Sequence, residues 1–461
     1  MSELDPSLLV TAPPGEEPEA VTPILVSESL RVVRASPWAL LSRFSGRPRG
    51  FWGRGGGWVA HGGLAWDWTC AEPSRVGRLR TALRALGADD PVGDQDLRLF
   101  GGFSFSRHGA SDPRWSAFPS ARFQVPQVEL RTDGEAYRLI ARARLTAGQD
   151  ERPVRAGLRD ELAALEAALA DEPAASPCAS APVAWSAAPE TQASFAAWTR
   201  NVRMALEAIQ GGRFRKVVLA RSVSVDPYRG VDALTATRRL YAPGSEARVF
   251  LFEPEPGRAL LGASPETLAR VHDGEAHATA VAGSIARGAD DTADREARAR
   301  LSASDKDLRE HGFVVRDMIE RLQALGADVS ADGEPHILTL PNIHHLETRI
   351  RARLPERVSV LDLIERLHPT PAVCGQPRDA ALEFIENQEG FDRGWYGAPV
   401  GWLDLRGNGV TAPALRCALL ERGRCHLFAG AGIVEGSDPT REWEETQLKL
   451  ETAGRALAGS A

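Results

Sequence analysis

The sequence is poor in cysteine, has no strong excess of either charge and has no long apolar run. Its five cysteines are odd in number and widely spaced without a CxxC pair, which argues against a disulfide framework and a zinc site. The net charge of −7 gives no basic footprint for nucleic acid. No segment reaches the roughly 18 apolar residues that span a bilayer, and the acidic, proline-rich start is unlike a signal peptide. We therefore expect a cytoplasmic protein without nucleic-acid or membrane partners.

Short apolar runs alternate with turn residues over the first 170 positions, and this pattern predicts strands joined by tight hairpins. The glycine run from Gly53 to Gly57 lacks the Lys-Ser/Thr ending of a phosphate loop, so we interpret it as a hairpin turn. A helix is predicted from about Pro153 to Glu172. We divide the chain into a flexible N-terminus over 1–20, a sheet-rich part over 21–183 that ends in a Pro/Ala/Ser connection, and the remainder over 184–461.

Helical and strand signals are sharper after that connection. Apolar residues recur at helical spacing over 195–209, and the apolar run over 216–220 that follows is typical of a buried strand. A second helix is predicted from Ser304 to Gly326, because serine and glycine are good residues for the two ends. A third helix, 360–367, should stop before Pro369, which has no N–H to donate.

Two glutamates near the C-terminus share one face of a predicted helix. Asp438 is a good N-cap and Pro439 a good first residue, so Glu442, Glu445 and Lys449 fall at i, i+3 and i+7. Carboxylates placed side by side repel each other unless a cation lies between them.

Glycines precede this helix in the run Ala429-Gly430-Ala431-Gly432. They allow backbone amides to approach an anion closely. Together with the carboxylates, they suggest a hard divalent ion, Mg²⁺, beside an anionic substrate.

Five further side chains could carry chemistry, and each has a plainer interpretation. Lys216, turned inward at the head of its strand, would be a general base, although such a lysine usually reaches out to water. Glu266, in a turn, could be a general acid or a solvated residue. Glu310 could bind a metal or simply face solvent. His345 could orient a substrate or be structural, and Arg416 could clamp a carboxylate or form a surface salt bridge.

The combination of these segments resembles the chorismate-utilising enzymes, a family that includes isochorismate, salicylate, anthranilate and aminodeoxychorismate synthases. The resemblance runs from about residue 194 to residue 450. It is carried by Lys216-Val217-Val218-Leu219-Ala220-Arg221, Ser264-Pro265-Glu266, Ala282-Gly283-Ser284, Glu310-His311, His345-Leu346, His368-Pro369-Thr370-Pro371-Ala372-Val373, Arg393-Gly394-Trp395-Tyr396 and the segment from Ala429 to Lys449. The segments Phe100 to Phe105 and Pro113 to Val125 are similar to the family's N-terminal half.

Single residues separate the members of this family. A lysine at the position of Lys216, which activates water, marks isochorismate and salicylate synthases. Aminodeoxychorismate synthases carry a nucleophilic lysine before the glycine matched by Gly283, where this chain has Ala282. Salicylate synthases tend to have a threonine in place of Ala372. The resemblance therefore favours an isochorismate synthase, with salicylate synthase and a non-catalytic chorismate-binding protein as alternatives.

The resemblance also implies roles for individual residues. Lys216 would deprotonate the water that attacks C2 of chorismate, and Glu266 would protonate the departing C4 hydroxyl. Mg²⁺ would be held by Glu310 and Glu445, with Glu442 and Asp307 acting through water. The substrate would be bound by Gly283, Ser284, His345, Tyr396, Arg416, Gly430, Gly432 and Lys449.

The implied fold is a single large α+β unit in which antiparallel sheets and helices surround a central cleft. We expect a monomer that takes chorismate and needs no glutamine amidotransferase subunit; the isochorismate could serve menaquinone or siderophore synthesis. One departure from the family stands before Arg416. Val410 replaces the usual glutamate, and Pro413 interrupts the strand, which predicts a displaced Arg416.

Overall fold

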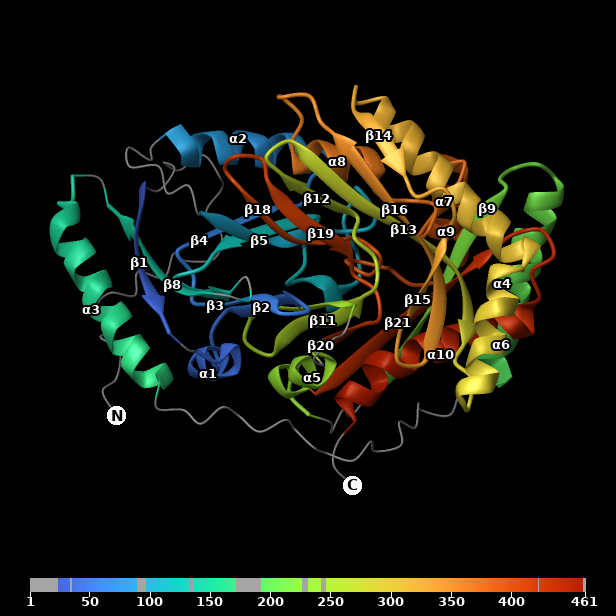
Figure 1. Ribbon diagram of the computed structural model, residues 1–461, viewed down its shortest axis with the longest axis horizontal. Coiled ribbons are helices and arrows are strands. Elements are labelled where there is room, and N and C mark those ends of the chain that lie inside the picture. Colours follow the sequence, from blue (N-terminus) through green and yellow to red (C-terminus); the bar gives the residue numbers. More distant parts are fainter. Residues whose placement is uncertain are drawn as a thin grey trace.

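The computed structural model describes residues 24–458 except 34, 89–96, 133, 135, 147, 171–191, 226–230, 242–245 and 422. Two large antiparallel sheets dominate this part of the chain (Figure 1). The first sheet has the order β1 (Ile24–Val32), β8 (Tyr137–Leu145), β7 (Val128–Thr132), β3 (Gly57–Gly62), β2 (Arg49–Arg54), β10 (Arg248–Glu255), β11 (Arg258–Ser264), β20 (Cys417–Glu421), β21 (Arg424–Ile433), β9 (Lys216–Val225) and β17 (Gly375–Gln376).

The second sheet has the order β14 (Asp328–Ala331), β16 (Ile343–Arg353), β13 (Glu275–Ala286), β12 (Ala269–His272), β19 (Gly409–Pro413), β18 (Pro399–Asp404), β5 (Arg98–Phe103), β6 (Ala121–Val125) and β4 (Trp66–Cys70). A further strand, β15 (His336–Thr339), pairs with β16. Both sheets combine early and late strands: Phe51 of β2 lies opposite Leu251 of β10, and Phe100 of β5 lies opposite Trp402 of β18. The expected Pro/Ala/Ser connection lies outside the described residues.

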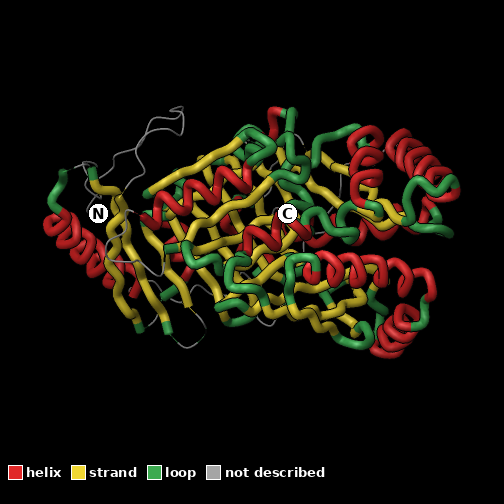
Figure 2. Tube along the Cα trace, turned by 90° about the horizontal axis from the view of Figure 1, so that it is seen from above, coloured by secondary structure: helices red, strands yellow, loops and turns green. Residues whose placement is uncertain are grey.

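Helices cover the outer faces of the two sheets, as the two perpendicular views show (Figures 1 and 2). They are α1 (Pro37–Arg43), α2 (Arg75–Ala88), α3 (Glu151–Ala170), α4 (Gln192–Gln210), α5 (Ala233–Leu240), α6 (Asp291–Ser302), α7 (Asp305–Gln323), α8 (Val360–Leu367), α9 (Arg378–Gln388), α10 (Pro439–Leu457) and the short 3-10 turn η2 (Pro113–Trp115). One core lies between the first sheet and α1, α3, α5 and α10, and another between the second sheet and α2, α7 and α8. A third, aromatic core joins the sheets themselves, with Trp52, Phe250 and Trp395 among its members. The α+β prediction is therefore confirmed.

Local signals in the sequence placed several of these elements well. The glycine run forms the turn between β2 and β3, where Gly55 has a φ of +59° that favours glycine. Ser304 caps α7 by accepting from the backbone N–H of Asp307, and Asp438 caps α10 through two backbone N–H groups at 3.0 Å. The end of α8 at Leu367 matches the expected stop before Pro369.

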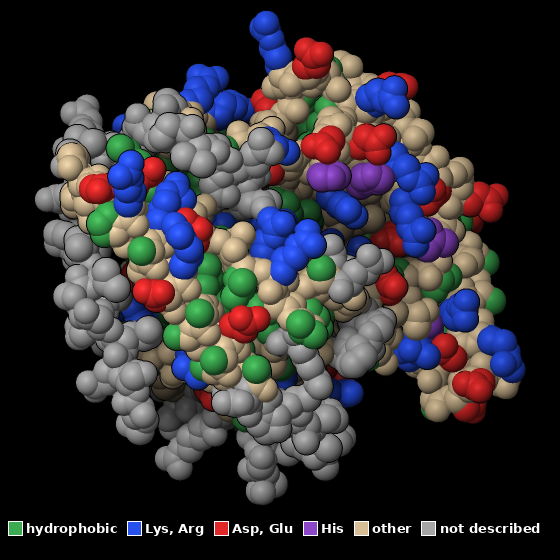
Figure 3. Space-filling view, turned by 60° about the vertical axis from the view of Figure 1, so that its left-hand side comes forward, with side chains coloured by type: hydrophobic (Ala, Val, Ile, Leu, Met, Phe, Trp, Pro, Cys, Tyr) green, Lys and Arg blue, Asp and Glu red, His purple; other side chains and the backbone are tan. Residues whose placement is uncertain are grey.

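Charges of both signs are mixed on the face shown in Figure 3, where Lys and Arg alternate with Asp and Glu among the described side chains. Within the described part of the chain, no helix has both the length and the apolar composition needed to cross a membrane.

Candidate active site

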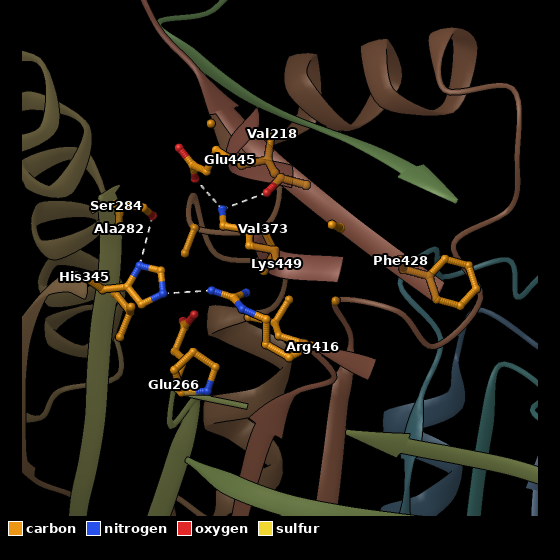
Figure 4. Close-up of a pocket in the computed structure, with 18 of the residues that line it drawn as sticks. Val218, Glu266, Ala282, Ser284, His345, Val373, Arg416, Phe428, Glu445 and Lys449 are labelled. Atoms are coloured by element: carbon orange, nitrogen blue, oxygen red, sulfur yellow. Dashed lines mark hydrogen bonds and ion pairs between the residues drawn. The ribbon is translucent and has the colours of Figure 1, made fainter. Parts of the chain in front are cut away.

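One pocket collects most of the residues that the sequence singled out. It is lined by Glu266, Gly283, Ser284, Glu310, His345, Tyr396, Arg416, Gly430, Gly432, Glu445 and Lys449, together with neighbouring residues (Figure 4). These residues come from both sheets, α7, α10 and the loops between them. Three of the expected residues do not line the pocket and lie behind its wall: Lys216, Asp307 and Glu442.

Glu266 is a buried carboxyl with an unsatisfied oxygen. It follows β11, is 2% exposed, and its Oε1 has no hydrogen-bond partner. Burial raises the pKa of Glu266 to about 8, against the opposing charges of Lys216 and Arg416; the charge of Glu347 raises it further. Glu266 therefore holds its proton at neutral pH, as a general acid must.

Lys216 begins β9 and is turned inward. Its side chain is fully buried, so the alternative in which it extends to water does not apply. Its Nζ lies 3.1 Å from Oε1 of Glu310 but makes no hydrogen bond of good geometry. Gly432, on the adjacent strand β21, leaves the space that the side chains of Lys216 and Glu310 occupy. A Cβ at this position would lie 2.1 Å from Oε1 of Glu310 and 3.1 Å from Cε of Lys216.

His345 links Arg416 to Ser284, as the dashed lines in Figure 4 show. Nη2 of Arg416 lies 2.8 Å from Nε2 of His345, and Nδ1 of His345 lies 2.9 Å from Oγ of Ser284. Burial lowers the pKa of His345 well below its usual value, so the ring is neutral. Because arginine can only donate, Nε2 accepts and Nδ1 carries the proton, which it donates to Ser284.

Arg416 lines the pocket although Pro413 precedes it. Pro413 is the last residue of β19 and lies opposite Pro399, so the sheet does not need its missing N–H. Arg416 then adopts a φ of +49°, and its buried side chain enters the pocket. Figure 4 shows the carboxyl of Glu266 close to this guanidinium.

Lysines accompany the carboxylates of α7 and α10. Nζ of Lys306 lies 2.6 Å from Oε1 of Glu442, and Nζ of Lys449 lies 2.5 Å from Oε1 of Glu445. Burial and the neighbouring charge of Glu445 raise the pKa of Glu442 to about 7 despite Lys306. Burial alone would also raise the pKa of Glu445, but Lys449 brings it below the usual value. The raised pKa of Glu442 therefore reflects burial first and nearby negative charge second, whereas the lowered pKa of Glu445 reflects its lysine partner.

Asp307 occupies the first turn of α7, where Oγ of Ser304 donates to its Oδ2 at 2.5 Å. Burial raises its pKa, and the charge of Glu310 adds to the rise. In the described ranges no three Asp, Glu, His or Cys side chains converge as a ready metal cage. The donor set nevertheless fits Mg²⁺: Glu310 and Glu445 both reach the pocket, carboxylate oxygens are its preferred ligands, and a cation would relieve the crowding around Glu442.

Sequence reasoning missed Arg393 as a pocket residue. Its guanidinium pairs with Glu389 and donates to the carbonyls of Val373 at 2.7 Å and Val218 at 2.9 Å. It therefore ties the pocket wall to the strand that Lys216 begins. The position of Arg393, three residues before Tyr396, could have indicated that it lies near the pocket. The sequence alone does not show which backbone carbonyls its side chain contacts. Phe428, Leu415 and several small residues of the lining were also not anticipated.

The assembled groups suit acid–base chemistry on an anionic substrate. A protonated carboxyl, a guanidinium and the carboxylates of Glu310 and Glu445 line one pocket, and the buried amine of Lys216 contacts Glu310 behind its wall. Such a set can bind a carboxylate, take a proton on one side and donate one on the other.

Comparisons with known proteins agree with this chemistry. A family model described as "Chorismate binding enzyme" matches residues 16–458. The "Salicylate biosynthesis isochorismate synthase" of Pseudomonas aeruginosa is 37% identical over 85% of this chain and 82% of its own length. "Isochorismate synthase MenF" of Bacillus subtilis is 34% identical over 78% and 74%. The solved structure of MenF, the menaquinone-specific isochorismate synthase from Escherichia coli, covers 95% of each chain at 26% identity and a TM-score of 0.74.

Proposed function

The chain belongs to the chorismate-binding enzymes, and from this membership we propose that it converts chorismate to isochorismate. The observation that carries the proposal is a buried and protonated carboxyl, Glu266, that lines the pocket, with a buried amine, Lys216, behind the pocket wall and near enough for its charge to act on the pKa of Glu266. Isomerisation of chorismate exchanges one ring hydroxyl for another and so needs both a proton acceptor and a proton donor.

Lys216 and Glu266 divide these tasks in the proposed mechanism. Lys216 takes a proton from a water molecule as its oxygen bonds to C2 of the ring. Both ring double bonds shift, the C4–O bond breaks, and Glu266 gives its proton to the departing hydroxyl, which leaves as water. The pKa of about 8 keeps Glu266 protonated for this step at neutral pH.

Mg²⁺ is the cofactor that we propose, held by Glu310 and Glu445 with Glu442 and Asp307 as outer partners. When bound, it supplies Lewis-acid stabilisation of charge at the substrate's ring carboxylate. Gly432 supports this assignment because only a residue without Cβ leaves room for Glu310 where it lies.

Substrate positioning falls to the remaining pocket residues. We assign the enolpyruvyl carboxylate to Arg416, Tyr396 and the backbone at Gly430 and Gly432. Nε of Arg416 is buried without a partner, which leaves a donor for an anionic ligand. We assign binding of the ring carboxylate to the backbone amides near Gly283 and Ser284, and orientation of the ring to His345. Lys449, which donates to the carbonyl of Gly430 at 2.8 Å, holds that glycine segment in place.

Salicylate synthase is the alternative activity, since the Pseudomonas aeruginosa relative is named for salicylate biosynthesis. It would add loss of pyruvate from isochorismate in the same site. Ala372 lines the pocket where the resemblance places threonine in salicylate synthases, and we therefore expect isochorismate as the end product.

A direct assay tests these proposals. Purified protein is incubated with Mg²⁺ and chorismate, and products are separated by chromatography, with excess isochorismatase as a coupled readout. We expect isochorismate without salicylate, and for Lys216→Ala a loss of about 3 kcal/mol of transition-state stabilisation, on the order of a hundredfold in rate. Accumulated salicylate and pyruvate would establish the alternative activity. Chorismate binding without any turnover would indicate a non-catalytic protein.

A further inference from the structure

Arg221 lies on β9, in the motif that begins with Lys216, and the proposed mechanism gives it no task. Side chains alternate between the two faces of a strand. Val218, on the face of Lys216, lines the pocket, whereas Leu219, on the face of Arg221, packs in a core beside Trp443. Arg221 is therefore directed away from the pocket and toward α10.

The guanidinium of Arg221 contacts α10 at two points. Its Cζ lies 3.8 Å from the centroid of the Trp443 ring, where the face of the indole attracts a cation. Its Nε donates to Oγ1 of Thr446 at 2.7 Å. This hydroxyl in turn donates to the backbone carbonyl of Trp443 at 2.7 Å, and Thr446 is fully buried. The two contact points are thus joined to each other.

Both contact points directly follow a glutamate of the carboxylate cluster. Trp443 comes after Glu442, and Thr446 comes after Glu445. One residue corresponds to about 100° of rotation around a helix axis. Arg221 therefore holds the side of α10 that lies roughly a quarter turn from the face that carries the carboxylates. Rotation of α10 about its axis would break both contacts and would move both carboxylates together.

An aromatic cluster holds the same turns of α10 against α4, which Figure 1 shows beside it. The Trp443 ring lies edge-on to Phe195 at 5.3 Å and tilted to Trp198 at 6.1 Å, measured between ring centroids. Nε1 of Trp198 also donates to the carbonyl of Pro439 at 3.0 Å. Arg221 adds to this cluster a link to β9, the strand that carries the buried lysine of the pocket wall.

We propose that Arg221 is a positioning residue for the Mg²⁺ site, a role that rests on the assignment of Glu445 and Glu442 to that site. By holding Trp443 and Thr446, it fixes the rotation of α10 and so the place of both carboxylates relative to β9. Mg²⁺ demands near-ideal octahedral geometry, so a small rotation of its ligands lowers its affinity.

Calorimetric titration of the full chain with Mg²⁺ alone, without substrate, tests this role. We expect Arg221→Gln to weaken Mg²⁺ binding roughly tenfold, as is usual when a residue that orients metal ligands is lost. In the coupled assay, half-maximal activity should need roughly tenfold more Mg²⁺, while KM for chorismate at saturating Mg²⁺ should change less than about twofold.

Arg47→Gln is the matched control for this titration. Arg47 also stacks on an aromatic ring, with its Cζ 5.4 Å from the centroid of Phe44. It lies beside α1, which contributes no residue to the pocket. The same substitution at this position should leave Mg²⁺ binding at the wild-type level.

Two variants of Thr446 separate the hydrogen bond from packing. Serine keeps the hydroxyl and loses a methyl group, whereas valine keeps the shape and loses the hydroxyl. Thr446→Val should weaken Mg²⁺ binding as Arg221→Gln does, and Thr446→Ser should bind Mg²⁺ like wild type. Packing alone predicts the reverse order, because valine fills the buried space. Melting temperatures in EDTA show whether each variant is folded, and if Arg221→Gln is not, the Thr446 pair decides.

The positioning role is refuted if folded Arg221→Gln and Thr446→Val bind Mg²⁺ as tightly as wild type. It is also refuted if Thr446→Ser loses as much affinity as Thr446→Val. A wild type that binds no Mg²⁺ would overturn the metal assignment and the role of Arg221 with it. A wild type that binds Mg²⁺ without turning over chorismate would refute the isomerase function alone, because the calorimetric comparison does not depend on turnover.

Discussion

Replacing Glu266 with glutamine should stabilise the protein at alkaline pH while removing most of its activity. Glutamine mimics the protonated carboxyl but does not ionise. In wild type, burial raises the pKa of Glu266 from 4.5 to about 8. Because the folded-state pKa is the higher one, the folded protein loses stability as pH rises from about 4.5 to about 8, and the loss is complete above 8.

The size of this effect follows from the pKa difference. A difference of about 3.5 pH units corresponds to about 5 kcal/mol at 1.36 kcal/mol per unit. Between pH 5 and pH 8, the stability of Glu266→Gln relative to wild type should therefore rise by about 4 kcal/mol, at roughly 1.4 kcal/mol per unit. Over the same range, kcat should lie at least about a hundredfold below wild type, because the general acid is gone.

Urea unfolding at several pH values, followed by circular dichroism, measures the stability difference, and the coupled assay measures kcat. Glu386→Gln, at an exposed position on α9, is the control whose stability difference should stay flat. The wild-type kcat/KM should also decline above a pH near 8 as Glu266 loses its proton. A change of less than about 1 kcal/mol in the stability difference between Glu266→Gln and wild type from pH 5 to 8 would refute the conclusion that Glu266 is protonated in the folded protein at neutral pH.

Three further changes probe other parts of the site. Gly432→Ala should keep the fold but lower kcat roughly a hundredfold, because the new Cβ would force Glu310 to move. A Mg²⁺ titration of activity should also show weaker Mg²⁺ binding, with half-maximal activity at a higher Mg²⁺ concentration. Arg393→Lys should lower kcat more than it raises KM, since lysine cannot hold Glu389 and two carbonyls at once; equal effects on both would argue against a positioning role. Removal of Mg²⁺ with EDTA should abolish turnover and lower the melting temperature slightly, and re-added Mg²⁺ should restore both; full activity in EDTA would exclude the proposed metal.

Local physics made much of the fold readable from the sequence. The caps at Ser304 and Asp438, the stop at Pro369 and the glycine hairpin before β3 act within a few residues, so their signals can be recognised in a short stretch of sequence. The residues of the pocket were also recognisable, because the resemblance rests on ordered motifs over more than half of the chain. The effect of Pro413 was harder to predict, because a pattern reveals a proline but not whether its strand ends there.

The sequence by itself determined which residue types are available: a lysine at the head of an apolar strand, a carboxyl in a turn, two glutamates on one helical face and glycines beside them. Only the tertiary structure decided their protonation and partners. The raised pKa of Glu266 depends on burial by segments distant in the chain, and the contact of Arg221 with Thr446 depends on the register of β9 in its sheet. Desolvation and register are properties of the packed molecule, since each depends on what the rest of the chain places around a residue.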